Sequence, residues 1–139
     1  MKIGEWETLG RARGLLVRQL GELGATEHAA YVTLNQENGR LRIYVATDLG
    51  LLDYAYGPAG ADAEGAWLLR GQLYRWPSVR GLRLQTDAQI DEDSGDVRSI
   101  WHLVAEDPKL ELSADSGGVG ERALAGLLPF AKACIEHAG

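Results

Sequence analysis

The sequence has little cysteine and no long apolar run. With a single cysteine, Cys134, the chain forms no internal disulfide. The N-terminal residues lack the apolar core of a signal peptide. No apolar run approaches the roughly eighteen residues that a membrane-spanning helix needs. We therefore expect a cytoplasmic protein with no integral membrane insertion.

Positive charge is also scarce. The formal net charge is −6 and the pI is about 5.0, so the long-range field of the protein repels polyanions. This argues against nucleic acid as a partner and restricts any phosphate binding to a local site. The composition, 45% hydrophobic and 24% charged residues, is that of an ordinary globular protein. A length of 139 residues predicts one domain, 1–139, with one core.

The clearest local pattern is a hairpin within residues 40–56. Two apolar runs rich in β-branched and aromatic residues flank Thr47-Asp48-Leu49-Gly50, where Asp favours a turn and Gly tolerates positive φ. Alternating apolar residues and turn signals predict further strands, so that residues 29–113 form seven antiparallel strands. The strands outside the hairpin are expected at 28–35, 66–74, 79–86, 97–105 and 109–113, with the acidic segment 91–96 as a turn.

A helix is expected at each end of this strand region. Within 5–23, large apolar residues recur at helical spacing and Gly24 follows as a C-cap; they are Trp6, Leu9, Leu16, Leu20 and Leu23. A closing helix lies within 119–137, starting near Glu121, and Pro129 predicts a kink or a restart in it. Its apolar stripe is expected to consist of Leu124, Leu127, Leu128, Ala131 and Ile135.

Two segments carry no periodic pattern. Small and polar residues make 57–65 a loop, which we expect to be the most mobile segment. Residues 117–120 are rich in glycine and precede a helix, where backbone amides can hold an anion. They lack the Lys-Ser/Thr of a nucleotide loop, and a flexible connection is the preferred interpretation.

The order of elements resembles that of bacterial pleckstrin-homology-like and GRAM-like domains. Residues 45–52 resemble the strand-turn segment of those domains, with Gly50 where they usually carry Arg or Lys, and residues 76–82 resemble the turn into their central strand. The resemblance implies an α+β fold, in which a strongly bent seven-stranded antiparallel sheet or barrel is capped by the C-terminal helix, with an extra N-terminal helix. It also implies a binding module, without naming the ligand.

A rival interpretation turns residues 66–75 into a helix. The chain would then resemble the small acidic α+β chaperones of bacterial secretion systems, which bind a partner polypeptide and would expose a large apolar patch. Gly71, in the middle of the run, and the strand-like residues after Val79 argue against it.

One cluster of cations stands out as a candidate site. Arg70, Arg75, Arg80 and Arg83 have no acid between them and are interleaved with Tyr74 and Trp76. Arginine forks suit phosphate or carboxylate, so the cluster indicates a site for an anionic ligand or acidic peptide. The alternative is that these arginines face the acidic segment 87–96 or solvent. Trp76, beside Pro77 in a turn, is the tryptophan that we expect to be most exposed.

The other candidates are weaker. Cys134 and His137 share a helix face, as in half of a zinc site, but His28 and His102 have no partner spacing. Residues 91–96 do not match a calcium loop, because Asp96 stands where glycine is required. No nucleophile, base and orienting group occur together. We therefore expect no catalytic residue, metal or cofactor, and a non-enzymatic module that binds a protein partner or associates with itself.

Overall fold

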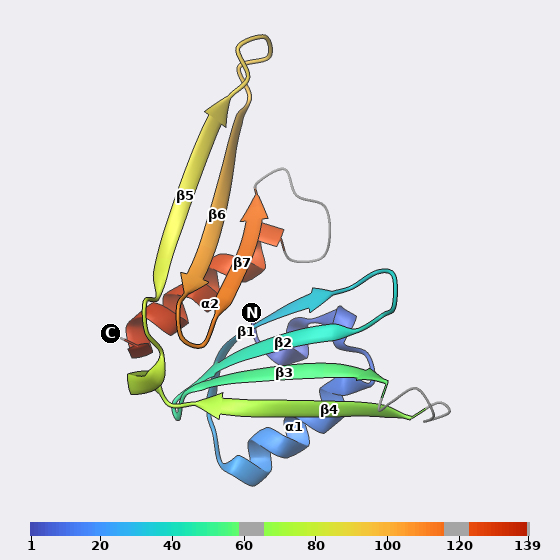
Figure 1. The fold of residues 1–139 in the computed structure, drawn as a ribbon. Helices are drawn as coiled ribbons and strands as arrows, with labels where there is room; N and C mark the ends of the chain where they lie inside the picture. The colour runs from blue at the N-terminus through green and yellow to red at the C-terminus, as the bar shows by residue number, and fades with distance from the viewer. Residues whose placement is uncertain (59–65, 116–122, 139) are drawn as a thin grey trace.

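The computed structural model describes residues 1–58, 66–115 and 123–138. The fold is α+β, with two antiparallel sheets, short 3-10 helices and one α-helix near each end (Figure 1). The first sheet has the order β1-β2-β3-β4 and the second has the order β5-β6-β7. The strands are β1 (Glu27–Leu34), β2 (Leu41–Thr47), β3 (Leu51–Pro58), β4 (Trp67–Tyr74), β5 (Arg83–Ile90), β6 (Val97–Ala105) and β7 (Leu110–Asp115). The helices are η1 (Ile3–Glu5), η2 (Glu7–Leu9), α1 (Ala12–Leu23), η3 (Trp76–Ser78) and α2 (Ala123–Ala138).

The β2–β3 hairpin forms as its sequence predicts. Ala46 pairs with Leu51 across the turn. The buried Thr47 closes this turn, because its hydroxyl donates to the carbonyl oxygen of Gly50 at 2.8 Å and accepts from the Gly50 amide at 3.2 Å. Every polar group at this buried position thus has a partner, as burial requires.

Two glycines allow close packing inside the first sheet. A Cβ on Gly50 would lie 2.3 Å from the carbonyl oxygen of Tyr74. This position therefore has no room for the Arg or Lys that pleckstrin-homology-like domains usually carry at the corresponding point. A Cβ on Gly71 would lie 2.3 Å from the ring of Tyr54, its direct partner on β3. Residues 67–74 form strand β4 and pair with β3 along their whole length, so the strand expected at 66–74 is confirmed and the helix of the rival interpretation over 66–75 is wrong.

The N-terminal region is more broken than the expected helix over 5–23. It consists of η1, η2 and α1, because Gly10 adopts a positive φ of 52° that ends η2. Gly24 caps α1 in the left-handed conformation, as predicted. The segment also covers the outer edge of β1, where the Ala30 amide donates to the Met1 carbonyl at 2.6 Å and the Ala30 carbonyl accepts from Nε1 of Trp6 at 3.1 Å.

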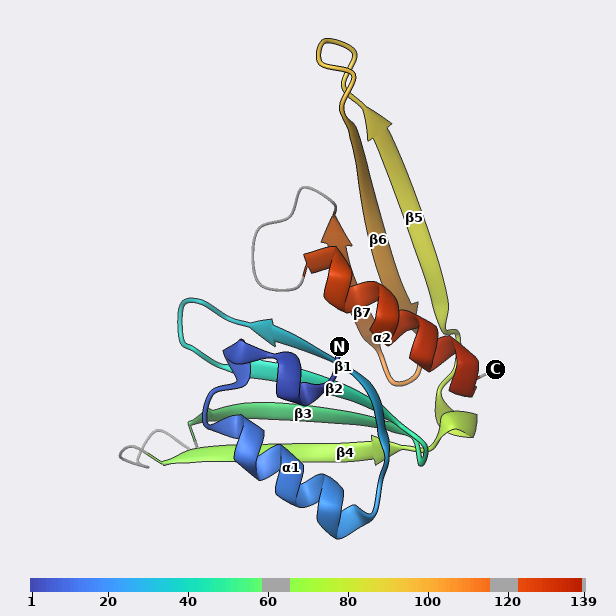
Figure 2. The ribbon, with the colours of Figure 1, turned by 180° about the vertical axis from the view of Figure 1, so that it is seen from behind.

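The two helices cover different sides of the first sheet. Figure 2 shows α1 lying across this sheet, and the buried residues of this helix are Ala12, Leu16 and Leu20. Helix α2 contacts β1 and β2 and also β6 and β7. Its Phe130 is fully buried, with its ring 6.2 Å from that of Tyr31 and 6.4 Å from that of Tyr44. Helix α2 therefore fills the angle between the two sheets.

The seven strands do not form one continuous bent sheet. The expectation of a single wrap over 29–113 is wrong, because residues 75–82 leave the first sheet through η3 and begin a second one. Strand β5 spans 83–90 rather than 79–86, since Pro77 and the positive φ of Gly81, 68°, keep the intervening residues out of the ladder. A single bridge, Arg80 with Asp107, ties this connection to the β6–β7 turn.

The apolar stripe of α2 also differs from the expected one. The buried side chains include Leu127, Phe130, Ala131 and Cys134, whereas Ile135 is 42% exposed. The helix is continuous through Pro129. This residue is exposed, so the backbone hydrogen bond that proline cannot donate is lost on the solvent side of the helix. The buried face of α2 is therefore rotated about the helix axis relative to the predicted one. It includes Phe130, which the predicted stripe did not contain.

The loop expected at 57–65 is wrong for Gly57 and Pro58, which belong to β3, and its residues 59–65 lie outside the described residues, as does the glycine-rich connection at 117–120. Over the ranges that are described, no helix has the length and apolarity to cross a bilayer.

Candidate functional site

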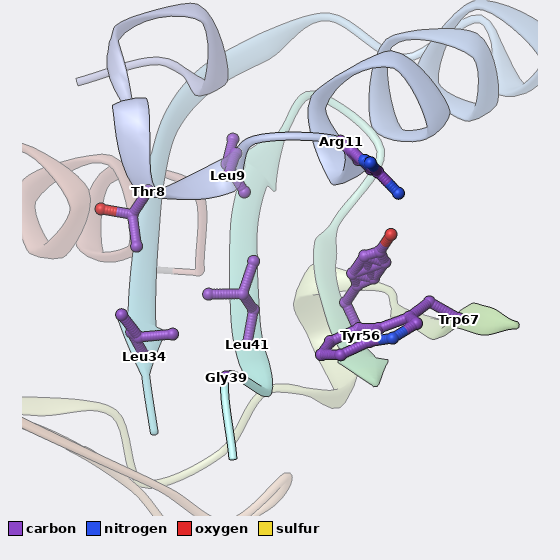
Figure 3. A pocket seen from close by; sticks show the side chains of 8 residues that line it. All are labelled: Thr8, Leu9, Arg11, Leu34, Gly39, Leu41, Tyr56 and Trp67. Atoms are coloured by element: carbon purple, nitrogen blue, oxygen red, sulfur yellow. The ribbon is translucent and has the colours of Figure 1, made fainter. Parts of the chain in front are cut away.

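A hollow of about 360 Å³ lies between the N-terminal segment and the first sheet (Figure 3). Leu9 forms its inner wall, and Leu34, Leu41 and Gly39 come from the β1–β2 hairpin. Tyr56 on β3 and Trp67 at the start of β4 form an aromatic wall, with ring centroids 5.2 Å apart. This size is at the lower end for small-molecule sites.

Trp67 gives the hollow its open aromatic surface. It is 43% exposed although it is the largest apolar side chain of β4. Its ring packs over Gly39, where a Cβ would lie 3.6 Å from it. Leu34, also in the lining, is 45% exposed. Exposed apolar side chains that line a concavity mark binding sites more often than isolated ones do.

The charged side chain among the described residues that line the hollow is positive. These described lining residues include Arg11 and Thr8 and no acidic side chain. Figure 3 shows Arg11 reaching over the hollow toward the hydroxyl end of Tyr56, with Trp67 below. One cation beside an apolar, aromatic surface is complementary to a molecule that has an apolar body and one anionic group.

The predicted arginine cluster is spread along the chain rather than gathered in one site. Arg70 lies in the middle of β4, and Arg75 directly follows that strand. Arg80 bridges to Asp107 through its backbone, and Arg83 at the start of β5 pairs with Glu106 at 3.5 Å. All four are exposed. Arg83 thus has an acidic neighbour, although in the β6–β7 turn rather than in the segment 87–96.

Arg70 does have basic neighbours, which come from β2 and its preceding turn. It lines one hollow of about 210 Å³ with Arg40 and another of about 210 Å³ with Arg42. Arg42 forms a bidentate ion pair with Asp53, in which Nε and Nη2 donate to the two carboxylate oxygens at 2.7 and 2.8 Å. This hydrogen bonding raises the pKa of the guanidinium. Arg40 and Arg70 therefore supply the positive charge that this surface offers to a ligand.

Trp76 is buried, so the expectation that it is the exposed tryptophan is wrong. It is 7% exposed, and its ring stacks on that of His137 at 5.7 Å. Nε1 donates to the carbonyl of Thr47 at 2.9 Å. The turn residues around Trp76 indicated exposure, but this turn lies against the end of α2, and Trp76 packs in the core.

Two of the histidines form a ring stack, and Cys134 is buried. His28 and His137 meet with ring centroids 4.3 Å apart, which their spacing in the sequence did not reveal. Cys134 is 1% exposed, and burial raises its pKa to about 12. Over the described residues, no group of three or more His, Cys, Asp or Glu side chains is arranged to hold a metal ion.

The acidic segment 91–96 forms the turn between β5 and β6, as expected. The Asp91 carboxylate accepts from the amides of Asp93 at 2.9 Å and Ser94 at 3.3 Å. These hydrogen bonds lower the pKa of Asp91. Its oxygens therefore hold the turn together.

The residues of the hollow come from five segments of the chain, which explains why no local pattern indicated them. Arg11 follows η2, and Trp67 lies more than fifty residues later on β4. The one available signal was the number of tryptophans, because four are many for a core of this size.

The chain matches no protein-family model, no curated protein and no solved structure.

Proposed function

We propose that the protein is a non-enzymatic binding module that takes a small amphiphilic anion in the hollow between Arg11 and Trp67. The observation that carries this proposal is the pairing of a 43% exposed tryptophan with a single cation across an apolar hollow. The ligand class is an alkyl or aryl carboxylate, phosphate or sulfonate. Its apolar part contacts Trp67 and Leu34, and its anionic group contacts the Arg11 guanidinium.

A thermal-stability screen tests the proposal. The probes are octanoate, octyl phosphate and 3-phenylpropionate, with octanol and octylammonium as neutral and cationic counterparts. A ligand that binds only the folded state stabilises it by RT ln(1 + [L]/Kd), about 2.7 kcal/mol at a hundred times Kd. We expect the anionic probes to raise the melting temperature more than octanol, and octylammonium to have no effect.

Two variants locate the site. Arg11→Gln is expected to weaken binding of octyl phosphate about tenfold, because a charge-assisted hydrogen bond at an exposed position contributes about 1.4 kcal/mol. Trp67→Ala is expected to weaken binding of both the anionic and the neutral probe. Binding that is unchanged in both variants would refute the proposal.

The second candidate is the surface around Arg70. The sequence predicted an anion site near it, made of Arg70, Arg75, Trp76, Arg80 and Arg83. The observation that favours it is the pair of hollows that Arg70 shares with Arg40 and Arg42. Its ligand would be a more polar anion, such as an acidic peptide, because exposed arginines there lie beside Gln72 and Ala55. Arg70→Gln is the matched control for Arg11→Gln: loss of anion binding in Arg70→Gln alone assigns the site to this surface.

We also propose that the chain is related to pleckstrin-homology-like domains, as the order of its elements indicated. Seven antiparallel strands followed by a helix that packs in the angle between sheets support it. The open division into two sheets departs from a barrel. We further propose a bacterial-type cytoplasmic location, which fits a chain whose one thiol is buried and unpaired.

A further inference from the structure

Strand β4 is the outermost strand of the first sheet, and among the described strands only β3 pairs with it. The two strands pair along all eight residues of β4 without a bulge. The backbone hydrogen bonds of the described turns and loops do not involve β4 either. Alternate amides and carbonyls of β4 therefore point away from the sheet, as they do at an unpaired edge.

This edge also lacks the features that usually protect an edge strand. On the opposite edge of the sheet, the N-terminal segment covers the backbone of Ala30 in β1 through Met1 and Trp6. Edge strands are otherwise protected by proline, lysine, a bulge or short length. Strand β4 has no proline, lysine or bulge, it is eight residues long, and six of these residues are exposed. Its outer side is thus a template on which an extended polypeptide can form a further strand.

The two faces of β4 differ in chemistry, and an added strand would lie beside both. One face carries Trp67, Leu69, Gly71 and Leu73, and the other carries Leu68, Arg70, Gln72 and Tyr74. The first face is turned toward the N-terminal segment, because Trp67 shares a hollow with Leu9 and Arg11. It is incompletely covered, since Leu73 is 37% exposed. Apolar side chains of an added strand would therefore extend the apolar layer on this face.

The face that carries Arg70 is positively charged. The described residues lining the two hollows beside Arg70 include three arginines, namely Arg40, Arg42 and Arg70, and one acid, Asp53. Asp53 is paired with Arg42 at 2.7 Å. The charges of Arg40 and Arg70 therefore remain for a ligand. Directly opposed side chains on neighbouring strands lie about 5 Å apart, so an acidic residue of an added strand would reach Arg70.

We propose that β4 binds an extended polypeptide segment as a fifth strand of the first sheet, and that this segment alternates apolar with acidic residues. Its apolar side chains lie beside Leu69 and Leu73, and its acidic side chains lie beside Arg70. This inference rests on the second candidate function, the Arg70 surface, and adds the conformation and the pattern of the ligand. A second copy of this chain is disfavoured as the occupant. Two β4 strands that paired about a two-fold axis at their middle would bring their Arg70 side chains together.

Fluorescence polarisation with a labelled acidic peptide, Ser-Val-Glu-Val-Glu-Val-Ser, tests the proposal on the full chain. We expect saturable binding, weakened about tenfold or more when lysine replaces both glutamates. A strand pairs with one neighbour through the amides of every second residue. Methylation of the alternate amides on one side of the peptide should therefore abolish binding, whereas methylation of those on the other side should preserve it. No binding of the acidic peptide, or equal effects of the two methylation patterns, would overturn the proposal.

A charge reversal locates the binding edge. Arg70→Glu should weaken binding of the acidic peptide about tenfold or more and should strengthen binding of its lysine counterpart. Lys132→Glu, at an exposed position on α2, makes the same change in net charge and should leave both affinities unchanged. Equal effects of Arg70→Glu and Lys132→Glu would overturn the proposal.

The outcomes also separate this inference from the proposed functions. Binding that depends on Arg70 but is indifferent to amide methylation would retain an acidic ligand on the Arg70 surface and refute strand addition. Peptide binding with the expected methylation pattern, in a protein that does not bind octyl phosphate, would support strand addition and refute only the hollow between Arg11 and Trp67.

Discussion

The indole Nε1 of Trp76 donates a hydrogen bond of 2.9 Å to the carbonyl oxygen of Thr47. The two residues are 29 positions apart, and both are buried. Trp76 belongs to the connection between the two sheets, and Thr47 ends β2 in the first sheet. This bond therefore holds the start of the second sheet against the turn of the central hairpin.

Trp76→Phe should lower the free energy of unfolding by about 1–3 kcal/mol, because it leaves the buried Thr47 carbonyl without its donor. Urea denaturation measures the change. Trp67→Phe, at the 43% exposed position on β4, is the control and should change stability by less than about 0.5 kcal/mol. Equal effects of the two substitutions would contradict the structural role of Trp76.

Glycines at three positions should respond in opposite directions to alanine. Gly14 and Gly21 lie in α1 with nothing within 4 Å of an added Cβ, so each Gly→Ala change should stabilise the protein by up to about 1 kcal/mol. At Gly50 the added Cβ would lie 2.3 Å from a backbone carbonyl oxygen, so Gly50→Ala should destabilise it by about 2 kcal/mol or more. Thermal melts of the three single variants check the signs, and a stable Gly50→Ala protein would show that β3 and β4 approach less closely.

Local patterns allowed the secondary structure to be predicted more fully than its assembly. The Thr47–Gly50 turn, the acidic turn and the strand over 66–74 each depend on neighbouring residues, and all three form. The separation into two sheets depends on where the chain leaves β4. Pro77 and Gly81 there resemble ordinary turn residues, and their sequence does not reveal that Trp76 is buried beneath α2.

The candidate site was less predictable, for a related reason. The arginines from 70 to 83 are close in sequence, but strand β4 and η3 separate them in space. Arg11 and Trp67 are distant in sequence, but the packing of the N-terminal segment on the first sheet brings them to one hollow. Phe130 illustrates the same limit, because its neighbour Pro129 suggested an interruption at the point where the helix is most buried.

The Cys134 thiol should be unreactive in the folded protein. Burial raises its pKa to about 12, so almost none is thiolate near pH 8, and the side chain is 1% exposed. A disulfide reagent should label one thiol per chain in urea and almost none without it. Under native conditions the labelling rate should fall with every stabilising substitution, such as Gly14→Ala. Complete labelling of the native protein within the mixing time would contradict the burial of α2 against the sheets.

Glu27 links stability to pH through the N-terminal segment. Its carboxylate accepts from the Ile3 amide, and burial raises its pKa above the ordinary value of 4.5, only partly opposed by that hydrogen bond. The folded state therefore binds the proton more tightly than the unfolded chain, so this group favours folding most below pH 4.5 and loses that contribution as pH rises through the folded-state pKa. Glu27→Gln keeps an oxygen for the Ile3 amide and removes the charge. We expect the variant to gain stability relative to the native chain as pH rises from 4.5 to neutrality, and to show no such gain at lower pH. Urea denaturation of both proteins across this range measures the difference, and a difference that shrinks with rising pH would show that the ionised carboxylate stabilises the segment instead.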